Sequence, residues 1–167
     1  MELDELLGLA GTRLRPATLD DAAELLVLQR CCWMQEALLN DTMEIPALHE
    51  DLADVRESIG TWQGWVVRQG PRLIAAVRAR EEDGAWEVGR LMVAPDLTGR
   101  GLGRFLLEYA ERQAPAALRR FTLFTGAASK RNITMYERAG YRVTPQSAEA
   151  DGHLQHAVYL VKDRAEG

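Results

Sequence analysis

The chain has 167 residues, of which 47% are hydrophobic and 27% are charged, and its formal net charge is −5. This composition can build the core of one ordinary domain, and no apolar run is long enough to cross a bilayer. The negative charge disfavours nucleic acid as a partner, because a phosphate-binding surface needs a basic excess. The acidic start, Met1 to Glu5, lacks the positive charge of a secretory signal, so we expect a cytoplasmic protein with no membrane partner.

The first third of the chain predicts a strand followed by two helices. Residues 13–15 indicate a short strand that ends at Pro16. Apolar residues at helical spacing then predict a helix from about residue 19 to about residue 34. Residues 40–46 break this pattern, and a second helix is expected at 47–58, ending before Gly60.

The helix expected at 19–34 contains both cysteines of the chain, Cys31 and Cys32. Adjacent cysteines rarely reach unstrained disulfide geometry, so the pair suits a reducing compartment and ordinary packing positions. No His or Cys stands at zinc-like spacing around them, and we expect no metal site.

Three strands are expected next. Residues 64–68 are mostly apolar, and residues 72–80 alternate as a strand with one buried face does. Asp83-Gly84 is a hairpin signal, and it is followed by a third strand from Trp86 to Val93. Pro95 and Asp96 end that strand.

The remaining elements alternate between helix and strand. We expect a helix from Leu102 to about residue 110, strands at 121–125, 141–144 and 154–161, and a helix at about 130–138 that ends at a Gly140 cap. This order predicts a mixed α/β fold with much antiparallel pairing. A single domain is expected, with a core from about residue 13 to about residue 162.

The most informative segment is a glycine loop between the third strand and the next helix. Gly99, Gly101 and Gly103 stand at every second position, directly before the helix. Glycines let backbone N–H groups approach a ligand, and the first turn of a helix offers unpaired donors and a positive dipole end. The loop therefore suits a pyrophosphate, and Arg100 and Arg104 add positive charge beside it.

Two other phosphate motifs fail on spacing. The dinucleotide fingerprint GxGxxG needs Gly or Ala where this chain has Arg104 or Leu106. The phosphate loop GxxxxGK(S/T) is nearly met at Gly84–Gly89, but Arg90 and Leu91 replace its last two residues. A tight strand-to-helix turn that binds no ligand remains the alternative.

Two motifs together resemble the GNAT N-acetyltransferase superfamily. Its pyrophosphate motif, Q/R-x-x-G-x-G/A, is similar to Thr98-Gly99-Arg100-Gly101-Leu102-Gly103, with Thr98 in place of the usual Gln or Arg. A second family pattern has an Asn, a Tyr four residues later, then Glu-x-x-Gly and an aromatic residue. It is matched from Asn132 through Tyr136 to Tyr141.

The resemblance implies a strongly bent, mostly antiparallel sheet that splays open between strands 86–93 and 121–125, flanked by about four helices. Acetyl-CoA is the implied cosubstrate. Its diphosphate would lie on residues 98–104, and its pantetheine arm would pair with the backbone of Leu91, Met92 and Val93. Asn132 would hydrogen-bond the arm from the other side. Dimers are common in the family, which allows a homodimer by analogy alone, and the sequence itself does not indicate the oligomeric state.

The same resemblance implies catalytic roles for Tyr136 and Glu87. Tyr136 corresponds to the family tyrosine that protonates the departing thiolate, with aromatic packing as the alternative. Glu87 is the candidate base, acting directly or through a water, with a solvated strand-end carboxylate as the alternative. In plain alternation Glu87 shares the cleft face with Leu91 and Val93, although relatives bulge this strand. A backbone N–H near Leu91 or Met92 would stabilise the oxyanion.

The expected reaction is acetyl transfer from acetyl-CoA to an amine by direct attack in a ternary complex. A non-catalytic acyl-CoA-binding sensor or interaction module and transfer of a longer acyl chain are the alternatives. In relatives the acceptor site is shaped by the first helices and the final hairpin. Those segments contain the acceptor candidates, namely Trp33, Glu36, Glu44, the loop 40–46, and His153 or His156.

Overall fold

The computed structural model describes residues 8–144 and 157–165. Its strands are β1 (Thr12–Pro16), β2 (Gln63–Gln69), β3 (Arg72–Glu82), β4 (Ala85–Val93), β5 (Arg120–Gly126), β6 (Arg142–Thr144) and β7 (Ala157–Asp163). Its helices are α2 (Ala22–Asn40), α3 (Pro46–His49), α4 (Leu52–Thr61), α5 (Leu102–Arg112) and α6 (Lys130–Arg138). The predicted mixed α/β class is confirmed.

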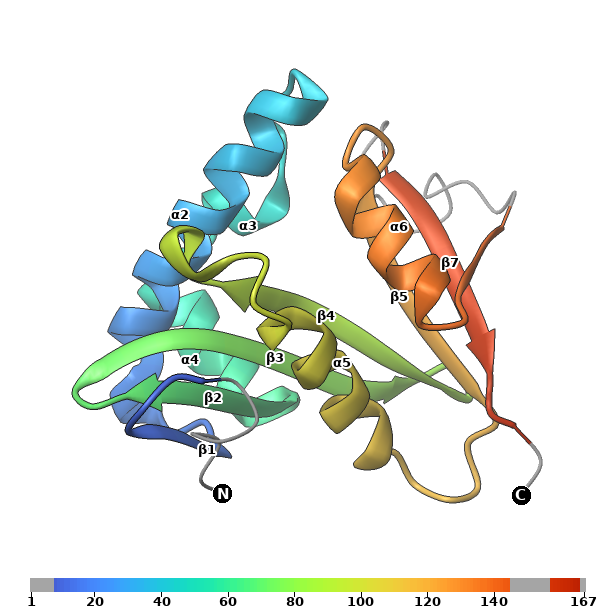
Figure 1. Cartoon of the computed structure of the whole chain (residues 1–167), viewed down its shortest axis with the longest axis horizontal. Helices are drawn as coiled ribbons and strands as arrows, with labels where there is room; N and C mark the ends of the chain where they lie inside the picture. The colour runs from blue at the N-terminus through green and yellow to red at the C-terminus, as the bar shows by residue number, and fades with distance from the viewer. Residues whose placement is uncertain (1–7, 145–156, 166–167) are drawn as a thin grey trace.

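The strands form one open sheet in the order β1-β2-β3-β4-β5-β7-β6. All described neighbours are antiparallel except β4 and β5, which run parallel. Those two strands pair only at Trp86 with Phe121 and at Glu87 with Thr122, and then diverge (Figure 1). The implied splay is therefore present, and it begins one residue after Glu87.

Helices cover both faces of the sheet beside this split. In Figure 1, α5 lies on one face of β3 and β4, and α2 and α4 lie on the other. Trp86 is fully buried under α5 and donates its indole N–H to the carbonyl of Ala110 at 2.9 Å. Leu25 and Val55 bury the inner faces of α2 and α4 against the sheet. Within the described residues, no helix has the length and apolar character needed to span a membrane.

The N-terminal helices differ from the sequence prediction in two ways. Helix α2 runs to Asn40, about six residues farther than expected. The single helix expected at 47–58 is two helices, α3 and α4, because Glu50 has extended backbone and Asp51 begins a new helix. The Asp51 carboxylate accepts from the N–H groups of Ala53 and Asp54 at 2.7 and 3.0 Å, as an N-cap does. Five α-helices are therefore described, where about four were expected.

The hairpin that joins β3 and β4 forms as predicted. Asp83 and Gly84 have φ angles of 51° and 73°, which a two-residue turn of this hand requires. Later in β4 the register shifts at Arg90, which has a φ angle of 47°, so the strand carries a bulge. Of the two arrangements left open for β4, the bulged one is present, and plain alternation ends at Gly89 because the extra residue reverses which face the following side chains occupy. Met92 accordingly lies on the α2 side, and Val93 lies toward α5.

The last elements follow the prediction. Helix α6 ends at Gly140, whose φ angle of 95° fits the predicted glycine cap. Strand β6 pairs with β7, and β7 pairs with β5 along its length. Residues 154–156, at the start of the predicted final strand, lie outside the described residues.

Candidate functional site

The glycine loop has the backbone conformation that its sequence predicted. Gly99 and Gly101 have φ angles of 82° and 84°, a region that side-chain-bearing residues rarely adopt. Gly101 is the N-cap of α5, so the N–H groups of Leu102, Gly103 and Arg104 begin the helix beside the loop. Backbone donors and the positive end of the α5 dipole therefore lie together at this loop, an arrangement that is compatible with a bound anion.

The side chains around the loop are mostly exposed. The Thr98 hydroxyl donates to the carbonyl of Pro95 at 3.2 Å and thus braces the loop internally. Arg104 pairs with Glu108 at 2.8 Å along the exposed face of α5, and Arg100 is exposed. Both arginines can turn toward a bound anion without disrupting the core.

A cation that sequence reasoning missed also reaches this loop. A guanidinium nitrogen of Arg131, from the first turn of α6, lies 3.2 Å from where a Cβ at Gly99 would be. A Cβ at Gly103 would lie 3.7 Å from the sulfur of Met135 and 3.7 Å from a methyl group of Val93. Helix α6 and the start of α5 therefore meet across the split. Only this contact, and no local motif, could have identified Arg131.

The edge of β4 that faces β5 has no strand partner beyond Glu87 in the described part of the chain. This edge includes the three residues predicted to pair with the pantetheine arm, namely Leu91, Met92 and Val93. Cys32, on α2, donates its thiol to the carbonyl of Val93 at 3.3 Å. Burial raises the pKa of this thiol to about 11. Cys32 thus packs against β4, although the two are far apart in sequence.

On the other side of the split, Asn132 is held by a residue of α2. Its side-chain amide donates to one carboxylate oxygen of Glu36 at 3.1 Å, and the Ser129 hydroxyl donates to the other oxygen. The Asn40 amide donates to Ser129 at 3.1 Å and accepts from the N–H of Ala128 at 3.0 Å. Hydrogen bonds therefore join the end of α2 to the loop between β5 and α6.

Tyr136 lies one helical turn after Asn132 and is buried, with 7% of its surface exposed. Burial, and then the nearby carboxylate of Glu36, raise the pKa of its hydroxyl above the ordinary value. Its ring packs edge-on against Tyr141, with centroids 6.1 Å apart. The Tyr136 ring can therefore pack against the core while its hydroxyl stays protonated, so the two alternatives for this residue do not exclude each other.

Glu87 does not share these neighbours. Its carboxylate accepts from the Nε of Arg80 at 3.0 Å, across the antiparallel pair β3–β4. The Arg80 guanidinium lies 4.2 Å from the ring centroid of Trp62, at the end of α4. Glu87 thus occupies the face of the sheet that α4 covers, at the residue where β4 and β5 separate. The structure places Tyr136 and Glu87 in different clusters.

The cluster around Trp62 contains a second arginine that sequence reasoning missed. The Arg78 guanidinium also lies over the Trp62 ring, 4.3 Å from its centroid. A Cβ at Gly89 would lie 3.4 Å from the same ring, so this glycine gives the indole room to lie on β4. Arg78 forms no ion pair within residues 8–144 and 157–165, and its Nε is buried without a hydrogen-bond partner.

A neighbouring arginine at the bulge does form an ion pair, although its Nε, like that of Arg78, is buried without a hydrogen-bond partner in the described residues. Arg90 forms an ion pair with Glu50, and its guanidinium lies 5.4 Å from the ring centroid of Trp33. Glu50 also accepts from the Gln29 amide at 2.7 Å. Burial opposes ionisation of Glu50, but Arg90 and Gln29 outweigh it and lower the pKa of this carboxyl. For Arg78, burial first and then Arg90 lower the pKa to about 10.

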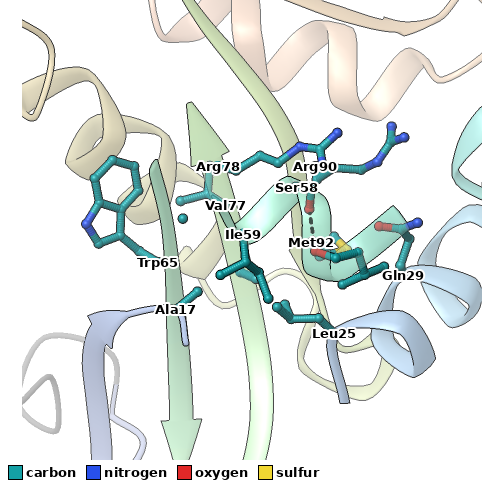
Figure 2. A pocket seen from close by; sticks show the side chains of 13 residues that line it. Ala17, Leu25, Gln29, Ser58, Ile59, Trp65, Val77, Arg78, Arg90 and Met92 are labelled. Atoms are coloured by element: carbon teal, nitrogen blue, oxygen red, sulfur yellow. Dashed lines mark hydrogen bonds between the residues drawn. The ribbon is translucent and has the colours of Figure 1, made fainter. Parts of the chain in front are cut away.

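Two pockets meet at Arg78. An inner pocket of 40 Å³ lies between α2, α4 and the sheet, and Figure 2 shows Arg78 and Arg90 above Ser58 at its polar end. An open pocket of 410 Å³ lies outside it, between α3, α4 and β3, and Trp62, Ser58 and Arg78 are among its lining residues. The inner pocket has room for a few waters at most, whereas the open pocket fits a small molecule.

The residues expected on the acceptor side fall in different places. Trp33 packs between the main core and a small apolar cluster of Ala37, Ile45 and Ala47. Glu36 bonds to Asn132. Glu44 is exposed in the loop that follows α2. His153 and His156 lie outside the described residues.

Comparisons with known proteins agree with this geometry. Residues 24–141 match the family model described as the acetyltransferase (GNAT) family. The PaiA N-acetyltransferase of Thermoplasma acidophilum, solved in complex with coenzyme A, superposes with a TM-score of 0.75 and 14% identity over 92% of this chain and 99% of that one. An acetyltransferase of Thermus thermophilus superposes with a TM-score of 0.69 and 21% identity, over 93% of this chain and 99% of that one.

A curated relative in sequence is the UPF0157 protein YqkA of Bacillus subtilis, which is 25% identical over 143 residues. The match covers 86% of this chain but 41% of the relative. The chain thus spans about two fifths of the length of that relative.

Proposed function

The chain belongs to the GNAT acetyltransferase family, and from this premise we propose that it transfers an acetyl group from acetyl-CoA to an amine in a ternary complex. One observation carries the proposal. The glycine loop with its left-handed Gly99 and Gly101 opens at the start of α5, directly after the unpaired edge of β4. A diphosphate on the loop and an extended arm along the strand edge fit that arrangement.

The protein groups that would hold the cosubstrate come from both sides of the split. The first-turn N–H groups of α5, with Arg100, Arg104 and Arg131 nearby, would neutralise the diphosphate. The backbone of residues 91–93 and the Asn132 amide would bind the pantetheine arm. Asn132 donates to Glu36 in this structure, so its amide oxygen remains the group to accept from the arm. When bound, acetyl-CoA supplies the activated acetyl carbonyl.

Proton balance assigns the two candidate catalytic residues. The acceptor amine must lose a proton to attack the carbonyl, and we assign that proton to Glu87, directly or through a water. The departing thiolate must gain a proton, and we assign its donor as Tyr136. Since burial and Glu36 keep this hydroxyl protonated, the residue is in the state a general acid needs. A backbone N–H at the β4 bulge, near Leu91 or Met92, would stabilise the oxyanion between these steps.

The cysteines support direct attack over an acetyl-enzyme intermediate. Cys32 is the thiol next to β4, and its pKa of about 11 leaves it protonated and weakly nucleophilic at neutral pH. Its hydrogen bond to Val93 also directs the thiol toward the strand backbone. Cys31, the preceding residue of α2, is exposed.

Two measurements test the proposal together. Calorimetry with coenzyme A should show saturable binding, and acetyl-CoA with a panel of primary amines should release thiol at a rate that depends on the amine. Binding of coenzyme A without amine-dependent thiol release would instead identify an acyl-CoA-binding module. No binding of coenzyme A would refute the proposal. Propionyl-CoA and succinyl-CoA in the same assay establish the acyl length.

A further inference from the structure

We propose that the open pocket between α4 and β3 binds a carboxylate of the acceptor through Arg78, so that the acceptor is an amino acid or a similar small zwitterion. The inference rests on the proposed transferase function and adds a substrate class to it. It is carried by three features that lie together beside the candidate base: an arginine with no ion pair in the described residues, a stacking indole and a pocket of small-molecule size.

The charge pattern singles out Arg78 among three neighbouring arginines. Arg80 is paired with Glu87, and Arg90 is paired with Glu50. Arg78 has no ion pair in the described part of the chain, although it lines the pocket and one of its donors is buried without an acceptor. A desolvated guanidinium with spare donors is the protein group best suited to a carboxylate, which it can bind through two parallel hydrogen bonds.

Trp62 makes this arginine a preorganised group. The indole ring lies against Gly89 of β4 and carries the guanidinium of Arg78 over its face. Stacking restricts the long side chain without using its hydrogen-bond donors. The planar edge of the guanidinium therefore stays available to a ligand.

The strand register places Arg78 beside the candidate base. Arg80 is the β3 partner of Glu87, and Arg78 is the partner of Gly89, the next residue of β4 on the same face. One such step along a strand is about 6 to 7 Å. A ligand with its amine near Glu87 and its carboxylate on Arg78 therefore needs only a short spacer between the two groups.

The opposite wall of the pocket argues for a zwitterion and against a dianion. Glu50, Asp54 and Glu57 also line the pocket. Glu50 is neutralised by Arg90, and Asp54 accepts from the N–H of Asp51 at 2.8 Å. The remaining negative charge of the α4 wall repels a dianion and attracts a cation. The pocket therefore favours a ligand whose single carboxylate lies on Arg78 and whose net charge is balanced by an ammonium group.

Pairs of acceptors that differ only in the carboxylate test the inference on the unmodified protein. Suitable pairs are alanine and alaninamide, phenylalanine and phenylalaninamide, β-alanine and β-alaninamide, and 4-aminobutyrate and its amide. Thiol release from acetyl-CoA gives kcat/KM for each. We expect at least one carboxylate to be preferred over its amide by about 10- to 100-fold, the range for a hydrogen-bonded charge pair. Amides that react as well as their acids in every pair would overturn the inference.

Two substitutions locate the preference at Arg78. Arg78→Met keeps the apolar stem, and we expect it to raise KM for the preferred carboxylate about 10- to 100-fold while leaving its amide partner within about twofold. Arg78→Lys keeps the charge but loses the planar guanidinium that can donate two parallel hydrogen bonds, so it should retain only part of the affinity for the carboxylate. Arg56→Met removes an equal charge from the exposed side of α4 and is the matched control. Comparing each variant with the unmodified protein cancels the different amine pKa values of acid and amide.

A binding measurement keeps the inference separate from the transferase proposal. Saturation-transfer NMR with N-acetylalanine and N-acetylalaninamide needs no turnover. Binding of N-acetylalanine that is lost in Arg78→Met supports the pocket even if no thiol is released. Equal binding of both probes in both proteins contradicts it, even if neutral amines are acetylated. A failure of the transferase proposal would appear instead as absent coenzyme A binding.

Discussion

Replacing the Tyr136 hydroxyl tests the proposed acid with little structural disturbance. Within the described residues this hydroxyl has no hydrogen bond, so Tyr136→Phe removes no internal partner. The ring stays packed against Tyr141, and we expect the free energy of unfolding to change by less than about 1 kcal/mol. If the hydroxyl protonates the thiolate, kcat should fall by about 10²- to 10⁴-fold, or about 3 to 5 kcal/mol in the barrier.

Tyr141→Phe is the matched control for this substitution. The Tyr141 hydroxyl donates to Glu111 at 2.9 Å, and burial together with that carboxylate also raises the pKa of Tyr141. Its loss should lower stability by about 1 kcal/mol, since Glu111 keeps its pair with Lys162. Turnover should stay within about twofold, because no proposed step uses this hydroxyl.

The pH dependence follows from the same raised pKa. Tyr136 is neutral below its ordinary pKa of about 10, and the raised folded-state pKa extends the neutral state to higher pH. The stability that this shift contributes is fully present below pH 10 and is lost as pH rises through the folded pKa. Stopped-flow thiol release and thermal unfolding between about pH 7 and pH 11 measure both effects. Unchanged kcat in Tyr136→Phe, with coenzyme A binding intact, would refute the reasoning.

Four further substitutions have expected outcomes. Glu87→Gln should lower kcat and remove the acidic limb of the pH–rate profile, and a limb that persists excludes Glu87 as the base. Asp21 is 1% exposed, and this burial raises the pKa of its carboxyl. Hydrogen bonds from Arg15 at 2.7 and 2.8 Å and from the Thr18 N–H outweigh burial and lower the pKa to about 2. The lowered pKa contributes about 2 kcal/mol to the free energy of unfolding above pH 4, and this contribution is lost as the pH falls toward 2. Urea unfolding of Asp21→Asn should lack this dependence on acid pH. Gly101→Ala forces a side chain into φ = 84° and should weaken coenzyme A binding about tenfold by calorimetry. Gly103→Ala, whose Cβ would make only 3.7 Å contacts, should bind nearly normally, and equal losses in both variants would count against the loop geometry.

The sequence by itself determined the elements whose signals are local. The glycine loop, the Asp83-Gly84 hairpin and the Gly140 cap were predictable because each depends on backbone angles that few residues adopt. The spacing of Asn132 and Tyr136 was readable for a similar reason, since residues four apart share one face of a helix. Boundaries were less certain, as the division of one predicted helix into α3 and α4 shows.

Only the tertiary structure decided which distant side chains meet. Glu36 reaches Asn132 across 96 residues, and Trp62 meets Arg78 because the end of α4 folds over β3 and β4. The bulge at Arg90 changed the faces of β4, which alternation alone could not foresee. Periodicity reports which way a side chain points relative to its own element, but contacts depend on strand register and on how helices pack across a sheet. The candidate acid Tyr136 could therefore be named from a motif, whereas the pocket at Arg78 could not.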